Sequence, residues 1–200
     1  MKPKAAIFDL GGVIVDVESD RLMAIAAQLS GLSFDEVLAA VYHPDLLQFE
    51  LGRLSPEQYY AGLKSRIRLP WTFEQFVGFW NDILREKRDV TALVERLHGR
   101  CRLLVLSNTN ILHMRYMKAI VPVLSKFDHL VGSYEVGACK PNPSVYRAVI
   151  ERSGVEPAEA VYFDDRLEMV EGGRCVGLRA IRFEHARKLE QDLRDVGLLD

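Results

Sequence analysis

A short apolar run at residues 4–10, KAAIFDL, constrains the fold more than any other feature, because Gly11-Gly12 ends it abruptly. Continuous apolar runs of this length, closed by a turn signal, are typical of strands buried on both faces. Comparable runs occupy residues 102–106, 129–134, 160–163 and 178–183, and helical patterns occupy 110–126, 143–153 and 166–176. This alternation predicts an α/β fold with a Rossmann-like three-layer core, in which helices cover both faces of a parallel sheet.

The stretch from residue 17 to residue 87 has a different character, because no strand-like run interrupts it. Helix-start signals occur at Ser33, Ser55 and Thr72, each followed three residues later by Glu or Gln. They predict a small all-helical cap, inserted after the first strand and joined to the core by short hinges. The expected division is a core of residues 1–16 and 88–200 and a cap of residues 17–87.

Composition limits the partners of the chain. Its 200 residues include 26 Lys and Arg against 28 Asp and Glu, a net charge of -2, so no broad cationic surface for nucleic acid or anionic lipid is expected. No segment reaches the roughly 18 apolar residues of a membrane span, and Asp9 interrupts the first apolar run in a way that argues against a secretory signal. Three widely spaced cysteines predict reduced thiols in a cytoplasm. The sequence predicts no particular oligomeric state.

Polar side chains follow four of the predicted strands. These are Asp9 after the first, Ser107 and Asn108 after the second, Lys140 beyond the third, and Asp164-Asp165 after the fourth. Ligands of parallel sheets bind at the carboxyl ends of the strands, so we expect these groups to converge on one site. Carboxylates so close together raise one another's pKa, which makes a cation their natural partner. Ligation by oxygen alone favours magnesium over zinc.

Four segments resemble the motifs of the haloacid dehalogenase (HAD) superfamily, in the same order: FDLGGVIVD, LLVLSNTN, Lys140 in ACKPNP, and VYFDDRLEMVEGG. The helical insertion falls where that superfamily places its smaller, C1-type cap. With the ELGRLS segment and His113 downstream of LSNTN, the chain is most similar to a bacterial subgroup that includes an α-glucose-1-phosphate phosphatase. The resemblance implies a magnesium-dependent phosphatase for a small phosphorylated metabolite, such as a sugar phosphate.

The resemblance also implies catalytic roles. Asp9 attacks phosphorus and forms an aspartyl-phosphate intermediate, which divides the displacement into two easier steps. Ser107 and Asn108 hold the phosphoryl oxygens, and Lys140 neutralises the charge spread over them. Glu168, on the helix after the fourth strand, is expected to be a partner for Lys140 or an exposed residue.

Magnesium ligands follow from the same resemblance. They are the Asp9 carboxylate, the backbone carbonyl of Gly11 and the carboxylate of Asp165, with Asp164 as a second or outer acid. Cap closure is expected to supply specificity by excluding water and adding side chains over the phosphoryl group. The candidates for this role are Arg21, His43, Glu50 and Arg53.

Gly11 departs from the superfamily pattern. Most of its phosphatases carry a second aspartate there, which protonates the leaving oxygen and later activates water. General acid-base assistance is worth roughly 10² to 10⁴ in rate, so slow turnover of ordinary alkyl phosphates is expected. Asp16, Glu18 or the cap residue Glu50 could take over the proton transfer.

Two other functions stay open. The chain could bind a phosphate ligand or a protein partner with little catalysis, because Gly11 carries no acid. It could also be a haloacid dehalogenase, but enzymes of that type need no metal and, by resemblance, lack an acidic pair like Asp164-Asp165.

Overall fold

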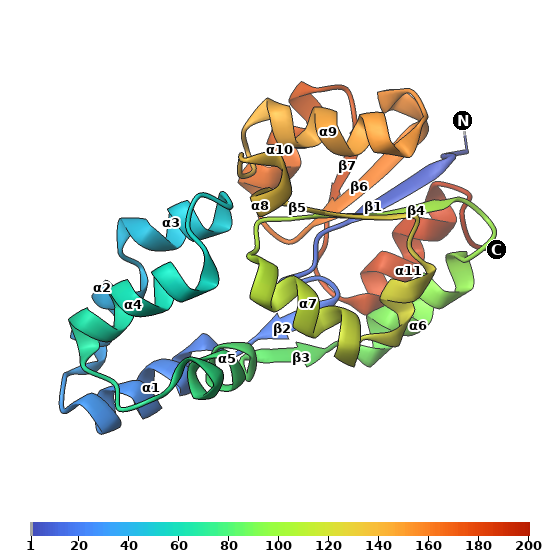
Figure 1. Cartoon of the computed structure of the whole chain (residues 1–200). Helices are drawn as coiled ribbons and strands as arrows, with labels where there is room; N and C mark the ends of the chain where they lie inside the picture. The colour runs from blue at the N-terminus through green and yellow to red at the C-terminus, as the bar shows by residue number, and fades with distance from the viewer. Residues whose placement is uncertain (1) are drawn as a thin grey trace.

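A five-stranded parallel sheet with helices on both faces forms the centre of the computed structural model, which describes residues 2–200 (Figure 1). The strand order is β5-β4-β1-β6-β7, and every neighbouring pair is parallel. The strands are β1 (Ala5–Phe8), β4 (Arg102–Ser107), β5 (His129–Gly132), β6 (Ala160–Asp164) and β7 (Arg179–Arg182). The predicted α/β fold is thereby confirmed. Residue 1, part of the predicted segment 1–16, lies outside the described residues.

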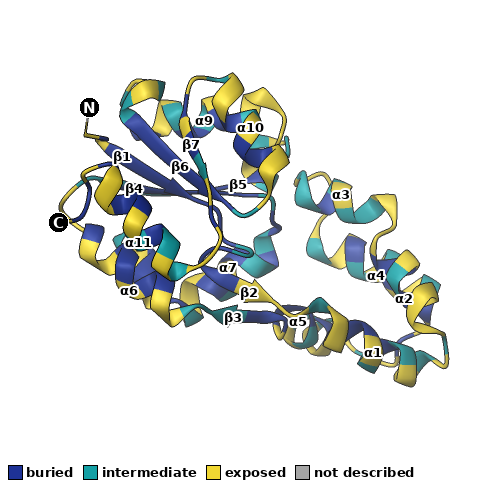
Figure 2. Cartoon of the chain, turned by 180° about the vertical axis from the view of Figure 1, so that it is seen from behind, coloured by how far each residue is buried: buried dark blue, intermediate teal, exposed yellow. Residues whose placement is uncertain are grey.

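Alternate residues of β1 face opposite layers of the core, as the period of a strand requires. Ala6 and Phe8 belong to one hydrophobic cluster, and Ala5 and Ile7 belong to the other. The helices α6 (Arg88–Leu97), α7 (Ile111–Ile120) and α11 (Ala186–Asp195) cover the first face, and α9 (Pro143–Ser153) and α10 (Leu167–Cys175) cover the second. Figure 2 shows the central strands buried between these layers, which explains their continuous apolar sequence.

Helix boundaries follow local chemistry. The predicted helix 143–153 is α9, whose start is fixed by the Asn142 side chain accepting from the Ser144 N–H at 3.0 Å. The predicted helix 110–126 is shorter than expected: α7 ends at Ile120, and the separate turn η1 (Pro122–Lys126) follows. Pro122 has no N–H to continue the α-helical ladder.

Five helices lie between the first and second core strands in sequence: α1 (Ser19–Ser30), α2 (Phe34–Val41), α3 (Pro44–Glu50), α4 (Pro56–Ile67) and α5 (Phe73–Asn81). The predicted capping boxes form at the starts of α2, α4 and α5. Stacked aromatic rings fill the space between the helices, with Tyr59 packing on Phe49 at 4.9 Å and on Trp80 at 5.3 Å between ring centroids. The exact division into core and cap at residues 16–17 and 87–88 stays a prediction.

Two unpredicted strands, β2 (Val15–Val17) and β3 (Leu84–Glu86), pair antiparallel where the helices join the core. We expected simple hinges at these joins. Each strand has three residues, too few for a periodic apolar pattern to reveal it. Lys87 fastens the ribbon to the loop after β1, because its ammonium donates to the Gly12 carbonyl at 3.2 Å and lies 3.1 Å from Asp16.

Among the described residues, no helix is by itself long and apolar enough to cross a membrane; α1 and α2 pass that test only as a pair, which is bent by 112°.

Candidate active site

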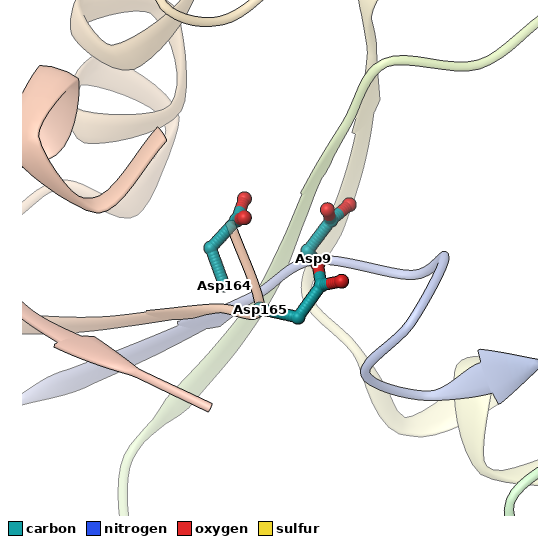
Figure 3. A group of neighbouring side chains, drawn as sticks. All are labelled: Asp9, Asp164 and Asp165. Carbon is teal, nitrogen blue, oxygen red and sulfur yellow. The ribbon is translucent and has the colours of Figure 1, made fainter. Parts of the chain in front are cut away.

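Three carboxylates meet at the carboxyl ends of β1 and β6. Asp9 follows β1, where its N–H donates to the Phe163 carbonyl of β6 at 2.9 Å. Asp164 ends β6 and Asp165 follows it. Oxygen atoms of the three acids lie within 4.8 Å of one another (Figure 3), with Asp164 and Asp9 buried and Asp165 half-buried. The parallel register thus brings together acids that are about 155 positions apart in the sequence, as expected of strand ends.

Lys140 lies between two of these acids. Its Nζ atom is 2.8 Å from Asp9 Oδ2 and 2.6 Å from Asp164 Oδ2, and its side chain is almost completely buried. The expected partnership with Glu168 is wrong, because Glu168 is exposed on α10 and lies 3.5 Å from Arg166. Removing one member of such a buried group would leave an uncompensated charge. The stability of each of the three side chains in its buried position therefore depends on the other two.

Burial and neighbouring charges set the pKa values of the cluster. Burial raises the pKa of Asp9 to about 6. The charge of Lys140 lowers this pKa, and the charge of Asp164 raises it. Burial alone would also raise the pKa of Asp164, but the Lys140 ammonium and then the Tyr162 hydroxyl hold it below its usual value. For Asp165, burial and the charge of Asp164 both raise the pKa. Two of the three acids therefore resist ionisation, which a bound cation would relieve.

Ser107 ends β4 beside this cluster, and Asn108 follows it. Ser107 is buried, and its hydroxyl is close enough to Asp9 to lower the pKa of that carboxyl. The Asn108 side chain accepts from the Lys140 N–H at 2.7 Å and donates to the Lys140 carbonyl at 3.0 Å. Both ends of the Asn108 side-chain amide are thus engaged by the Lys140 backbone, so this side chain positions Lys140. The expected role of Asn108 toward phosphoryl oxygens stays a prediction.

Tyr162 and Gly12 contribute to the site although the sequence analysis did not select them. The Tyr162 hydroxyl donates to Asp164 Oδ2. A signal was available, since residues two apart on a strand share a face. Gly12 has a φ of 77°, and a Cβ there would lie 2.5 Å from Asp165 Oδ2. Only glycine therefore lets the loop after β1 approach the acid so closely.

The donor set fits magnesium. Asp9, Asp164 and Asp165 offer carboxylate oxygens alone, with no histidine or cysteine in the group, and hard oxygen donors are the ligands that magnesium prefers. Gly11 lines the same hollow as Asp9 and Asp165. Both oxygens of Asp164 already accept hydrogen bonds, one from Lys140 and Tyr162 and the other from the Arg166 N–H at 2.9 Å.

Two adjoining hollows form one cleft beside these residues, because Gly11, Val17, Ser107 and Asn108 line both. We call the hollow that contains Asp9, Lys140 and Asp165 the acidic end. The other, the cap end, is lined by Glu50, Trp80, His113 and a larger group of apolar side chains: Leu10, Val15, Leu22, Met23, Val41, Leu46, Ile83, Leu84 and Met117. The cleft thus joins a charged pocket to a mainly apolar one.

Of the four cap residues expected to determine specificity, Glu50 is the one that lines the cleft. Arg21, His43 and Arg53 are exposed and contact other groups on the surface of the cap helices. Burial raises the pKa of Glu50 to about 7.

A parallel α/β sheet with this arrangement of strand-end acids and lysine defines a hydrolase of the HAD type. The chain belongs to this family: the sequence model of the haloacid dehalogenase-like hydrolases matches residues 3–177. Among its relatives is a D-ribitol-5-phosphate phosphatase from Bacteroides thetaiotaomicron, 27% identical over 95% of this chain and 96% of the relative. A sesquiterpene phosphatase from Aspergillus oryzae is 26% identical over 96% of each chain. The predicted HAD-type phosphomonoester hydrolase is confirmed at this level, whereas the subgroup stays a prediction.

Solved structures agree on the fold. A HAD family enzyme from Bacteroides thetaiotaomicron, in complex with magnesium and inorganic phosphate, matches with a TM-score of 0.82 at 24% identity, over 91% of this chain and 94% of that one. An L-2-haloacid dehalogenase from Xanthobacter autotrophicus matches with a TM-score of 0.67 at 19% identity, over 99% and 85% of the two chains. Because phosphatase and dehalogenase share this fold, the choice between them depends on the site residues.

Proposed function

We propose that the chain is a magnesium-dependent phosphatase that hydrolyses a small phosphorylated metabolite through an aspartyl-phosphate on Asp9. The observation that carries the proposal is the placement of the buried Lys140 ammonium between Asp9 and Asp164, with Asp165 alongside. This arrangement offers a nucleophilic carboxylate, a fixed cation for phosphoryl oxygens and a set of oxygen ligands at one end of a cleft.

Asp9 is held in place for attack on phosphorus. Its Oδ1 accepts from the Leu10 N–H at 2.7 Å and its Oδ2 contacts Lys140, and both interactions favour the ionised, nucleophilic form. In the first step a bond forms between an Asp9 oxygen and phosphorus, while the bond to the leaving oxygen breaks. In the second step water attacks phosphorus and the Asp9 carboxylate leaves.

Lys140 and Ser107 stabilise the phosphoryl oxygens during both steps. The charge of a loose transition state spreads over these oxygens, so a fixed cation beside Asp9 lowers the barrier without reorganisation of the site. Asn108 serves this step indirectly, because it holds the Lys140 backbone from both sides.

Asp9, Asp165 and the Gly11 carbonyl are the proposed magnesium ligands. Asp164 acts behind them, since both of its oxygens are hydrogen-bonded to Lys140, Tyr162 and the Arg166 N–H. Magnesium, when bound, supplies positive charge that balances the carboxylates and polarises the phosphoryl group.

The substrate class rests on the cap end of the cleft. Sugar phosphates are one candidate class, in line with the D-ribitol-5-phosphate phosphatase relative. A second candidate class is phosphate monoesters with less polar organic groups. It is favoured by the apolar side chains that line most of the cap end and is in line with the sesquiterpene phosphatase relative.

A phosphate-binding role with little turnover is the second candidate, and Gly11 is the observation in its favour. Dehalogenation is disfavoured, because a reaction at carbon gives the acidic pair Asp164-Asp165 no task.

A hydrolysis screen tests the proposal. Purified protein would be assayed for phosphate release from sugar phosphates, nucleotides, a prenyl phosphate and an aryl phosphate, with magnesium or with a chelator, and with Asp9→Asn as the control. We expect magnesium-dependent release that the variant lacks. No release above the variant on any substrate would refute catalysis and favour binding, and metal-independent halide release from a 2-haloacid would support dehalogenation instead.

A further inference from the structure

Gly11 leaves the nucleophile without an acid two residues away, yet an alkyl leaving group needs a proton. We infer that Glu50, on the cap, donates this proton to the leaving oxygen and later takes a proton from the attacking water. The inference rests on the proposed phosphatase function and assigns the acid-base step within it.

The position of Glu50 supports this assignment. Glu50 is the last residue of α3 and lines the cap end of the cleft. The cap end shares Gly11, Ser107 and Asn108 with the acidic end. A phosphoryl group beside Asp9 whose leaving oxygen faces these shared residues would present that oxygen to the hollow that Glu50 lines.

The backbone of Glu50 is fixed to the core. The Ser133 hydroxyl donates to the Glu50 carbonyl at 2.7 Å and accepts from the Thr109 N–H at 3.0 Å. Two residues further, Gly52 has a φ of 69°, and a Cβ there would lie 2.3 Å from the Tyr134 carbonyl oxygen. The end of α3 thus contacts the short helix α8 (Ser133–Val136), as Figure 1 shows. This contact holds the carboxyl over the cleft.

The two alternative acids are each paired with a cation, and Asp16 also lines the acidic end of the cleft. Asp16 lies 3.1 Å from Lys87, and Glu18 lies 3.7 Å from Arg85. Both side chains are also more than half exposed, whereas Glu50 lines the interior of the cleft. Within residues 2–200, the Glu50 carboxyl makes neither an ion pair nor a hydrogen bond, and it is largely buried.

The surroundings of Glu50 keep its proton available near neutrality. Burial raises the pKa of Glu50 to about 7. The titratable groups around it are Tyr59 on α4, Tyr42 at the end of α2, Cys139 before α9 and His113 across the cleft on α7. Burial raises the pKa of the Tyr59 and Cys139 side chains and lowers the pKa of His113 to about 4, so these three are neutral at pH 7. A carboxyl with a pKa near the working pH can both donate and accept a proton.

The proton balance is complete with Glu50 alone. As the bond between phosphorus and the leaving oxygen breaks, the Glu50 carboxyl transfers its proton to that oxygen, which departs as an alcohol. The resulting carboxylate then accepts a proton from water as the water oxygen bonds to phosphorus. Phosphate leaves, the Asp9 carboxylate is restored, and Glu50 is again protonated.

Glu50→Gln tests the inference, with Glu74→Gln as the matched control because Glu74 is an exposed carboxylate elsewhere in the cap helices. We expect kcat/KM, which reports the steps up to departure of the leaving group, to fall by about 10² to 10³ on an alkyl phosphate and far less on p-nitrophenyl phosphate, whose leaving group needs no proton. Because Glu50 also activates water in the second step, kcat should fall on both substrates. The decline of wild-type kcat/KM above about pH 7 should also disappear in the variant. The control should keep both properties.

Gly11→Asp provides a rescue. A Cβ at Gly11 would lie 3.4 Å from Val17 Cγ2, an ordinary contact, so the backbone there accepts a side chain. We expect Gly11→Asp combined with Glu50→Gln to recover turnover of the alkyl phosphate. If Glu50→Gln loses kcat/KM equally on both substrates, or keeps the wild-type dependence of kcat/KM on the leaving group, Glu50 is not the acid. Activity that still requires Asp9 would then leave the phosphatase proposal standing. A wild-type protein without phosphate release would instead remove the phosphatase proposal itself.

Discussion

The acidic end of the cleft and its cap end place carboxylates in opposite environments. At the acidic end, Asp9 and Asp164 are both within 2.8 Å of Lys140. At the cap end, Glu50 has apolar neighbours and no partner among the described residues. The Lys140 ammonium favours the ionised forms of Asp9 and Asp164 against the effect of burial, which still raises the pKa of Asp9 to about 6. Burial raises the pKa of Glu50 to about 7 with no cation to oppose it. This difference supports the proposal that the core performs the chemistry at phosphorus and that the cap transfers the proton.

Of the substitutions considered, replacement of Lys140 should have the largest effect on the stability and activity of the acidic end. Lys140→Met leaves two buried carboxylates without their cation, so the free energy of unfolding should fall by about 3 to 5 kcal/mol. The loss of a fixed charge beside the phosphoryl group should lower kcat by about 10² to 10³. Phosphate release and urea unfolding near pH 7 measure the two effects. If this variant kept wild-type kcat and stability, the contacts of Lys140 with Asp9 and Asp164 would be needed for neither catalysis nor folding.

Gly12→Ala tests the approach of the loop to Asp165. The new Cβ would lie 2.5 Å from Asp165 Oδ2, so this acid must move. Magnesium affinity, measured by calorimetry, should fall by about 10 to 100-fold, the range found when groups that orient metal ligands are disturbed. Gly31→Ala is the control, because Gly31 has a similar φ of 72° with no atom within 4 Å of its Cβ position. An equal loss in both variants would attribute the effect to backbone strain.

Asn108→Ala should weaken the acidic end through Lys140. Its removal leaves the Lys140 N–H and carbonyl without their partners, which costs about 1 to 3 kcal/mol of stability. We expect kcat to fall about 10-fold with little change in KM, because Asn108 positions a group that stabilises the transition state. A rise in KM at constant kcat would contradict this and indicate direct substrate binding.

Glu50→Gln tests the cap end of the cleft through the pH dependence of the free energy of unfolding. Glu50 has a pKa of about 7 in the folded chain against the usual 4.5, so the folded state keeps a proton that the unfolded chain has released. The free energy of unfolding of the wild type should therefore fall as pH rises from about 4.5 through about 7. The variant should lack this step and gain about 1 to 3 kcal/mol relative to wild type at about pH 8. Thermal melts at the two ends of this range measure the difference.

The sequence predicted the core well because its signals are local. Buried strands form apolar runs in the sequence. Asp9 and Asp165 directly follow such strands, Ser107 ends one, and Lys140 lies beyond β5 and α8. The ribbon of β2 and β3 was not predicted, since two strands of three residues form through pairing between positions about 70 apart. The helix α11, after the last strand, was also missed.

Side-chain partners in the site were less predictable. Asn108 reaches Lys140 across 32 positions, and Ser133 reaches Glu50 across 83. No spacing rule connects such residues before the sheet order is known. Glu168 was assigned to Lys140 from its helical face, but Asp164 at the strand end lies deeper and contacts the ammonium instead.

Trapping the covalent intermediate tests the central claim most directly. The enzyme would be quenched with acid during turnover, reduced with borohydride and digested for mass mapping, and a parallel reaction would run in heavy-oxygen water. We predict that Asp9 is recovered as homoserine, the product of a reduced aspartyl-phosphate, and that heavy oxygen enters phosphate and not Asp9. An unmodified Asp9, or heavy oxygen in its carboxylate, would contradict attack of this residue on phosphorus.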